Sequence, residues 1–137
     1  MSERASVVLF GAEAVAPLLR ERFRLLAAPP ADGPVAVIAQ GAAAAEAIPL
    51  ASDPKLVERL VLAEPDCPTE VLEQLADVSA PTLILWGTTD PRQDGELYQK
   101  RIPRAYLMYV YGQLSPEPFA RLAADFIQRG DAFAVMI

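Results

Sequence analysis

Short, almost wholly apolar runs alternate along this chain with segments that mix apolar and polar residues. The runs are rich in β-branched and aromatic residues, and each stops at a glycine, a proline or a charged residue, as buried strands do. Six strands are expected, at Ser6–Phe10, Arg24–Ala27, Val35–Ala39, Val57–Ala63, Pro81–Trp86 and Tyr106–Val110. The third is apolar at every position, which is typical of a central parallel strand covered on both faces.

The segments between these runs show the spacing of amphipathic helices. Apolar residues that share one helix face are Val15, Leu18, Leu19 and Phe23, then Val71, Leu72, Leu75 and Val78, and finally Phe119, Leu122, Ala123, Phe126 and Ile127. Pro68 is expected at the first position of the second of these helices, and a shorter helix is expected around Glu96–Arg101. The alanine-rich helix that begins at Ala42 is expected to kink or end at Pro49.

Strands that alternate with helical segments of roughly ten residues predict βαβ units and a parallel sheet. The expected fold class is therefore α/β: a three-layer αβα arrangement with a mostly parallel sheet of about six strands and right-handed crossovers. The length of 137 residues and the absence of an internal linker predict one domain over residues 1–137. The sixth strand is expected at a sheet edge, and the apolar tail Ala132–Ile137 is expected to add a strand or dock on a neighbour.

Composition narrows the function classes. The chain is 53% hydrophobic with a net charge of −6, and it has no run of Lys or Arg, so neither nucleic acid nor an anionic membrane is an expected partner. Its one cysteine, Cys67, rules out an intrachain disulfide. The charged start MSERASVV and the absence of an apolar run of about eighteen residues predict a soluble, cytoplasmic protein.

There is no histidine anywhere in the chain. Ser-His-Asp and Cys-His sites need an imidazole to move a proton near neutral pH, so composition alone excludes these mechanisms and any His-ligated metal. No cluster of carboxylates has the spacing of metal ligands either. No cofactor and no metal are expected.

The stretch Pro34–Glu46 is the organising feature of the sequence. An apolar strand meets a tight turn at Gln40-Gly41, and the alanine-rich helix follows at once. Strand, sharp turn and helix form the layout of a nucleophile elbow, G-x-S-x-G, in which a serine stands on a strained turn. The corresponding residues here are Ala39-Gln40-Gly41-Ala42-Ala43, so the nucleophile position is occupied by Gly41.

Three segments together resemble the α/β-hydrolase family. PVAVIAQGAAAAEAI followed by VERLVLAEP is similar to the elbow strand, its helix and the next strand; APTLILWGTTDP is similar to P-T-L-x-L-W-G-x-x-D-P; IPRAYLMYVYG followed by SPEPFARLAADFIQRG is similar to the last strand and helix. The resemblance implies the fold of that family over nearly the whole chain.

The resemblance also places the family's catalytic positions on this sequence. The acid falls on Asp90 and the nucleophile on Gly41, while the histidine expected after Gly112 is missing and its loop is short. No room remains for a cap domain after Glu64. The chain therefore looks like a minimal member that lacks the cap and the Ser and His of the triad.

Each candidate residue has a structural alternative. Asp90 is either the relic acid, a functional carboxylate paired with Asp94, or a turn residue that accepts hydrogen bonds from backbone amides. Gly41 is expected at positive φ, and the amide of Gln40 would point into the crevice or simply complete the turn. Free amides near Gly11 suit an anion, although no G-x-G-x-x-G follows. Gly11, Gln40, Gly41 and Asp90 are thus the candidate ligand-binding residues.

Three functions follow from these observations. The leading hypothesis is a catalytically incompetent α/β-hydrolase-like protein that acts as a binding or assembly module and forms a homodimer. The alternatives are a weak or atypical hydrolase in which Asp90 activates water, and a carrier of a small apolar ligand in the crevice near Gly41 and Asp90.

Overall fold

The computed structural model describes residues 5–31 and 33–129, and its centre is a six-stranded sheet. The strand order is β2-β1-β3-β4-β5-β6, and every neighbouring pair is parallel. The strands are β1 (Ser6–Phe10), β2 (Arg24–Leu26), β3 (Val35–Gln40), β4 (Val57–Ala63), β5 (Thr82–Gly87) and β6 (Ala105–Val110). The mostly parallel sheet predicted from the sequence is confirmed, and it is parallel throughout.

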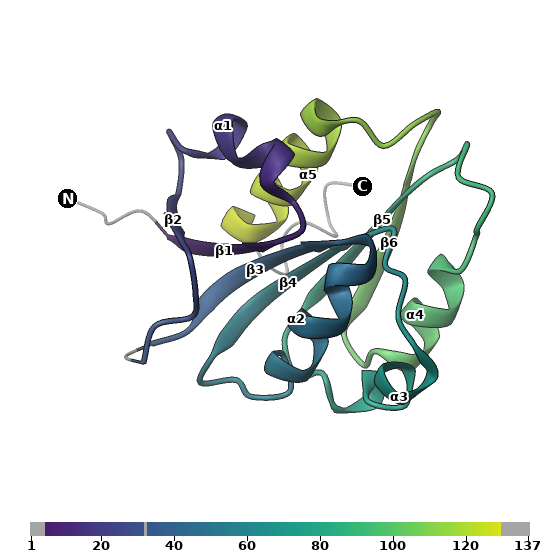
Figure 1. Ribbon diagram of the computed structural model, residues 1–137, viewed down its shortest axis with the longest axis horizontal. Coiled ribbons are helices and arrows are strands. Elements are labelled where there is room, and N and C mark those ends of the chain that lie inside the picture. Colours follow the sequence, from purple (N-terminus) through teal and green to yellow (C-terminus); the bar gives the residue numbers. More distant parts are fainter. Residues whose placement is uncertain (1–4, 32, 130–137) are drawn as a thin grey trace.

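Helices cover both faces of this sheet (Figure 1). The short 3-10 helix η1 (Glu13–Val15), α1 (Ala16–Leu19) and α5 (Pro116–Arg129) lie on one face. The other face carries η2 (Gly41–Ala43), α2 (Ala44–Leu50), α3 (Thr69–Leu72), η3 (Leu75–Asp77) and α4 (Gly95–Arg101). Side chains of β3, β4 and β5 are buried on both sides, so the three-layer αβα prediction is confirmed.

The first predicted helix is shorter than its apolar spacing suggests. It ends at Leu19, because the amides of Arg22 and Phe23 both turn back to the Leu19 carbonyl and close a tight turn. Phe23 is nevertheless buried just after the turn, whereas Leu18 is 48% exposed. The apolar face was therefore correct for Val15, Leu19 and Phe23 and wrong for Leu18.

The helix expected to begin at Pro68 differs in detail from the prediction, whereas the helix that contains Pro49 agrees with it. Pro68 precedes the first residue of α3 instead of occupying it, and the helix breaks into α3 and η3. The buried face of that helix is nevertheless formed, by Val71, Leu75 and Val78. Pro49 lies inside α2, which ends one residue later at Leu50, as the missing proline N–H predicts.

The order of the strands places the sequence-derived candidates at one point of the sheet. The chain leaves β1 outward to β2 and then returns to the other side of β1 to form β3. Ligands in open α/β sheets bind at such a switch point, beyond the carboxyl ends of the strands. Gly11 follows β1 and Gly41 follows β3, so both lie there. The expected apolar tail, 132–137, lies outside the described residues.

Candidate functional site

The elbow turn after β3 has the geometry that its sequence predicts. Gln40 is extended and Gly41 has φ +61°, a left-handed conformation that L residues rarely adopt. A Cβ added to Gly41 would meet nothing within 4 Å, so the turn presents bare backbone to open space. The Gly41 carbonyl accepts a hydrogen bond of 3.1 Å from the amide of Asp66, which ties the elbow to the segment after β4.

Gly11 packs directly against this elbow. Its φ is +66°, and a Cβ there would lie 2.7 Å from the Ala43 Cβ and 3.1 Å from the Gln40 carbonyl oxygen. The turn after β1 therefore approaches the Ala43 methyl group and the Gln40 carbonyl so closely that only a residue without a side chain fits at position 11. This close contact accounts for Gly11 by packing.

Asp90 occupies a turn after β5. Its Oδ1 accepts a hydrogen bond of 2.9 Å from the amide of Arg92, and its own amide donates to the Gly87 carbonyl at 3.3 Å. The Arg92 guanidinium lies 3.9 Å from Asp90 Oδ2. The carboxylate thus has the local backbone partner expected of a turn residue. Asp94 lies at the start of α4.

Glu64 is the site residue that sequence reasoning missed. It follows β4 directly with φ +46°, the one positive φ at a non-glycine position among the described residues. Its Oε2 accepts a hydrogen bond of 3.1 Å from the Gly87 amide. Burial raises the pKa of Glu64, and the charge and hydrogen bond of the neighbouring Asp90 raise it further, against the lowering effect of the Gly87 amide. Glu64 and Asp90 form a carboxyl pair.

The Arg92 guanidinium binds the backbone beside this pair. It donates to the carbonyl of Pro65 at 2.8 Å and to the carbonyl of Glu64 at 3.0 Å. It also lies over the Trp86 ring, 5.3 Å from the centroid. Since Trp86 Nε1 donates to the Arg92 carbonyl at 2.7 Å, the two residues bind each other twice. Trp86 is fully buried.

The carboxyl pair lines an open hollow of about 320 Å³. The residues around it are Glu64, Thr89, Asp90, Pro91, Gln113 and Leu114. The three candidates on the other side of the sheet end, Gly11, Gln40 and Gly41, do not line it. The structure therefore brings Asp90 together with Glu64 rather than with the elbow. Two adjacent carboxyls, one with a raised pKa, can share a proton and accept hydrogen bonds from a polar ligand.

The segment after β6, where the resemblance placed a histidine, packs against the end of β5 and the turn that follows it. The Gly112 amide donates to Thr88 Oγ1 at 2.8 Å, and the Thr89 amide donates to the Gly112 carbonyl at 3.2 Å. A Cβ on Gly87 would lie 2.7 Å from the Leu114 nitrogen and 2.8 Å from the Gly112 carbonyl oxygen. Backbone therefore fills the space above the end of β5.

Cys67 lies behind this site and faces Tyr98. Burial raises the pKa of the Cys67 thiol, against the lowering effect of its hydrogen bond with Tyr98. Burial likewise raises the pKa of Tyr98, which is 2% exposed. A thiol without thiolate character is a poor nucleophile, so this geometry favours a packing role for Cys67.

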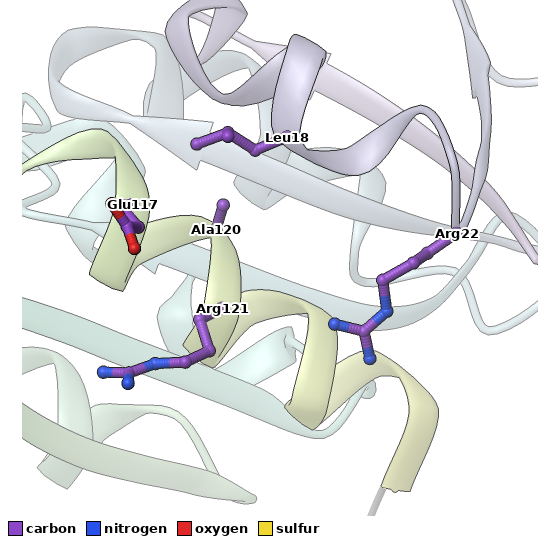
Figure 2. Close-up of a pocket in the computed structure, with 5 residues that line it drawn as sticks. All are labelled: Leu18, Arg22, Glu117, Ala120 and Arg121. Carbon is purple, nitrogen blue, oxygen red and sulfur yellow. The ribbon is translucent and has the colours of Figure 1, made fainter.

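A second, smaller hollow of about 190 Å³ lies between α1 and α5 (Figure 2). Figure 2 shows Leu18 of α1 above Ala120 of α5, with Arg22 pointing toward the later turns of α5. Arg22 is engaged there by the side chain of Gln128 and by Asp125, at 3.7 Å from its Oδ1. This hollow lies between two helices, and it shares no lining residue with the hollow at the carboxyl pair.

In the described residues, 5–31 and 33–129, no three or more His, Cys, Asp or Glu side chains gather closely enough to hold a metal ion. Nor does any helix in this part of the chain combine the length and apolarity needed to cross a membrane.

The chain matches no protein-family model and no curated protein at a significant level. Its fold does match solved structures. A protein described as a predicted CIB-like hydrolase from Thermoplasma acidophilum is 14% identical with a TM-score of 0.74; the match covers 93% of this chain and 88% of that one. For an α/β hydrolase from Sphaerobacter thermophilus the identity is 15%, the TM-score 0.71, and the coverage 91% and 93%.

A thioesterase domain from the curacin biosynthetic pathway is also similar, with 12% identity, a TM-score of 0.66 and coverage of 92% and 90%. These structures share their fold with this chain at identities too low to transfer an activity. The chain therefore has the α/β-hydrolase fold, reduced to 137 residues around a six-stranded parallel sheet.

Proposed function

We propose that this protein is a catalytically incompetent member of the α/β-hydrolase fold that acts as a binding or assembly module and self-associates. The observation that carries the proposal is the elbow at Gly41, a half-buried left-handed turn without a side chain, in a chain that contains no histidine. Acyl transfer by a Ser-His-Asp triad needs a serine hydroxyl at the elbow to attack the substrate and a histidine to take its proton. This chain has neither residue in those roles.

The state of Asp90 supports the same proposal. In a triad the acid orients the imidazole, but here Oδ1 of Asp90 accepts from the Arg92 amide and the carboxylate lies beside Glu64 and the Arg92 guanidinium. Backbone of the segment 112–114 fills the place above β5. We also propose a cytoplasmic location, which suits a chain whose one cysteine, Cys67, cannot form an intrachain disulfide.

Two measurements test this proposal. A fluorophosphonate probe labels activated serine nucleophiles, and we expect no labelling of the purified protein; stoichiometric labelling would overturn the loss of catalysis. Light scattering coupled to gel filtration tests the proposed self-association. We expect a mass of twice the chain mass of 14.8 kDa. A monomer at every concentration would overturn self-association.

The hydrolase alternative has one specific observation in its favour. Glu64 and Asp90 lie together in an open hollow, and Glu64 has both a raised pKa and a left-handed backbone, a combination found at functional sites. A carboxylate of the pair would then activate water while the other carboxyl supplied a proton. Ester hydrolysis that disappears in both Glu64→Gln and Asp90→Asn would establish this alternative.

A further inference from the structure

The two edges of the sheet are built differently. β2 has only the three residues Arg24–Leu26, and the Arg24 guanidinium donates to Ser6 Oγ beside it. Short edge strands with charged side chains resist pairing with other chains. β6 is twice as long and reads AYLMYV, followed by Tyr111, without a charge or a proline. β6 therefore lacks the protection that β2 has.

The outer side of β6 offers backbone hydrogen-bonding groups. The Thr82 amide donates to the Arg104 carbonyl at 2.8 Å, and the Thr88 amide donates to the Val110 carbonyl at 3.0 Å. Since successive residues of a strand turn their backbone groups to opposite sides, the even-numbered positions face β5. The amides and carbonyls of Ala105, Leu107 and Tyr109 consequently face away from the sheet. β6 has no second neighbour in the described part of the chain.

Apolar side chains accompany this open edge. Tyr109 is 45% exposed and Tyr111 is 97% exposed, and these are two of the three large hydrophobic side chains that stand out into solvent among the described residues. Leu107 and Ala105, on the same face as Tyr109, are only partly buried against the α4 side of the core. Tyr106, Met108 and Val110 are likewise only partly buried on the α5 side.

The helix beside this edge carries opposite charges at its two ends. α4 follows β5 and leads into β6, so it runs antiparallel to both strands. Glu96 is exposed in its first turn, and Lys100 and Arg101 are exposed in its last. We infer that the self-association proposed above runs through β6: two copies pair these strands antiparallel about a two-fold axis, and the sheet continues from one copy into the other.

This arrangement brings the two α4 helices together with matched charges. The axis stands perpendicular to the sheet, so both α4 helices lie on the same face and run antiparallel, with Glu96 of each copy near Lys100 and Arg101 of the other. Adjacent strands are about 4.8 Å apart. A helix over the β5–β6 boundary is then about 10 Å from its symmetry mate, which is the distance of packed helices. Pairing about a two-fold axis covers the β6 edge of each copy, so the assembly stops at two copies.

The inference rests on the proposed self-association, and one experiment separates the two. Light scattering is measured for the full chain, for Tyr109→Lys, and for Leu18→Lys as the control at the third exposed apolar side chain. We expect the wild-type chain and the Leu18→Lys control to be dimers, and Tyr109→Lys to be a monomer of 14.8 kDa. Tyr111→Lys, at a fully exposed position, is expected to weaken the dimer without affecting the fold. A monomeric wild type overturns both proposals; a dimeric Tyr109→Lys, or a monomeric Leu18→Lys, overturns the β6 interface alone.

A charge exchange on α4 tests the geometry of the pair. Glu96→Lys places like charges across the axis, and so does the double variant Lys100→Glu/Arg101→Glu. We expect each to dissociate more readily than wild type, and an equimolar mixture of the two to form heterodimers, because every facing pair is then attractive. Two variants that dimerise as wild type does, or a mixture that stays monomeric, would overturn the antiparallel arrangement.

Discussion

Nη2 of Arg92 donates a hydrogen bond of 3.0 Å to the carbonyl of Glu64, whose φ is +46°. A glutamate in this conformation costs about 1–3 kcal/mol, so the surrounding contacts must hold it there. The guanidinium supplies this restraint from the loop after β5, and it reaches the Pro65 carbonyl with its other nitrogen. The strained end of β4 is thus held by a residue far away in the sequence.

Arg92→Lys is expected to destabilise the fold by about 1–3 kcal/mol, because one ammonium cannot serve both carbonyls and stack on Trp86. Arg121→Lys, at an exposed position of α5, is the matched control and is expected to leave stability within about 0.5 kcal/mol of wild type. Urea unfolding measures both. Equal midpoints for the two variants would contradict the role given to Arg92.

Glu64 is expected to make stability depend on pH. Its pKa in the folded protein is raised above the usual 4.5, so the folded state holds the proton more tightly than the unfolded state. The resulting stabilisation is fully present below pH 4.5 and is lost as the pH rises through the raised pKa. The difference in unfolding free energy between wild type and Glu64→Gln should therefore fall over that window. A profile for Glu64→Gln that stays flat over this window would contradict the raised pKa of Glu64.

Gly87→Ala should be among the least tolerated glycine substitutions, because its methyl group would lie 2.7 Å from the Leu114 nitrogen. Backbone cannot move aside as a flexible side chain can, so we expect a loss of about 1–3 kcal/mol. Gly33→Ala is the control, since a Cβ there meets nothing within 4 Å. Thermal unfolding compares the two, and a Gly87→Ala protein as stable as the control would show that the segment 112–114 does not pack on β5 as described.

Gly41→Ser restores a hydroxyl at the elbow and is expected to restore no triad catalysis. The added side chain has space, but at φ +61° it costs about 1–2 kcal/mol. Gly41→Ala carries the same backbone cost without the hydroxyl, so the two variants should unfold alike and be equally inactive toward p-nitrophenyl esters. Esterase activity in Gly41→Ser alone would show that the site can still generate a nucleophile.

The fold was predictable because its signals are local. The apolar runs gave all six strands to within a residue or two at their ends, and the positive φ expected of Gly41 is present. Helix continuity was less predictable: periodicity shows which side chains can share a face, but not that the turn after Leu19 or the break after Leu72 interrupts the helix. Those interruptions depend on backbone contacts elsewhere in the chain.

The candidate site was predicted only in part. Asp90 was predicted as a candidate from its turn sequence and from the resemblance of its segment to the α/β-hydrolase family. Glu64 and Arg92 were not predicted. A charged residue that ends a strand is ordinarily solvated, so the sequence alone does not single out Glu64. The available signal in the sequence is its position directly before Pro65 and after the apolar run Leu60–Ala63. Only the parallel pairing of β4 with β5 brings it to Asp90, and that contact is non-local.

We propose that a hydrolase fold persists here without hydrolase chemistry. The most direct test of this proposal is the rate of p-nitrophenyl ester hydrolysis by the wild-type protein, measured beside the double variant Glu64→Gln/Asp90→Asn. We expect equal rates for the two proteins, neither of which exceeds the rate in buffer. A wild-type rate above that of the double variant would contradict the proposal.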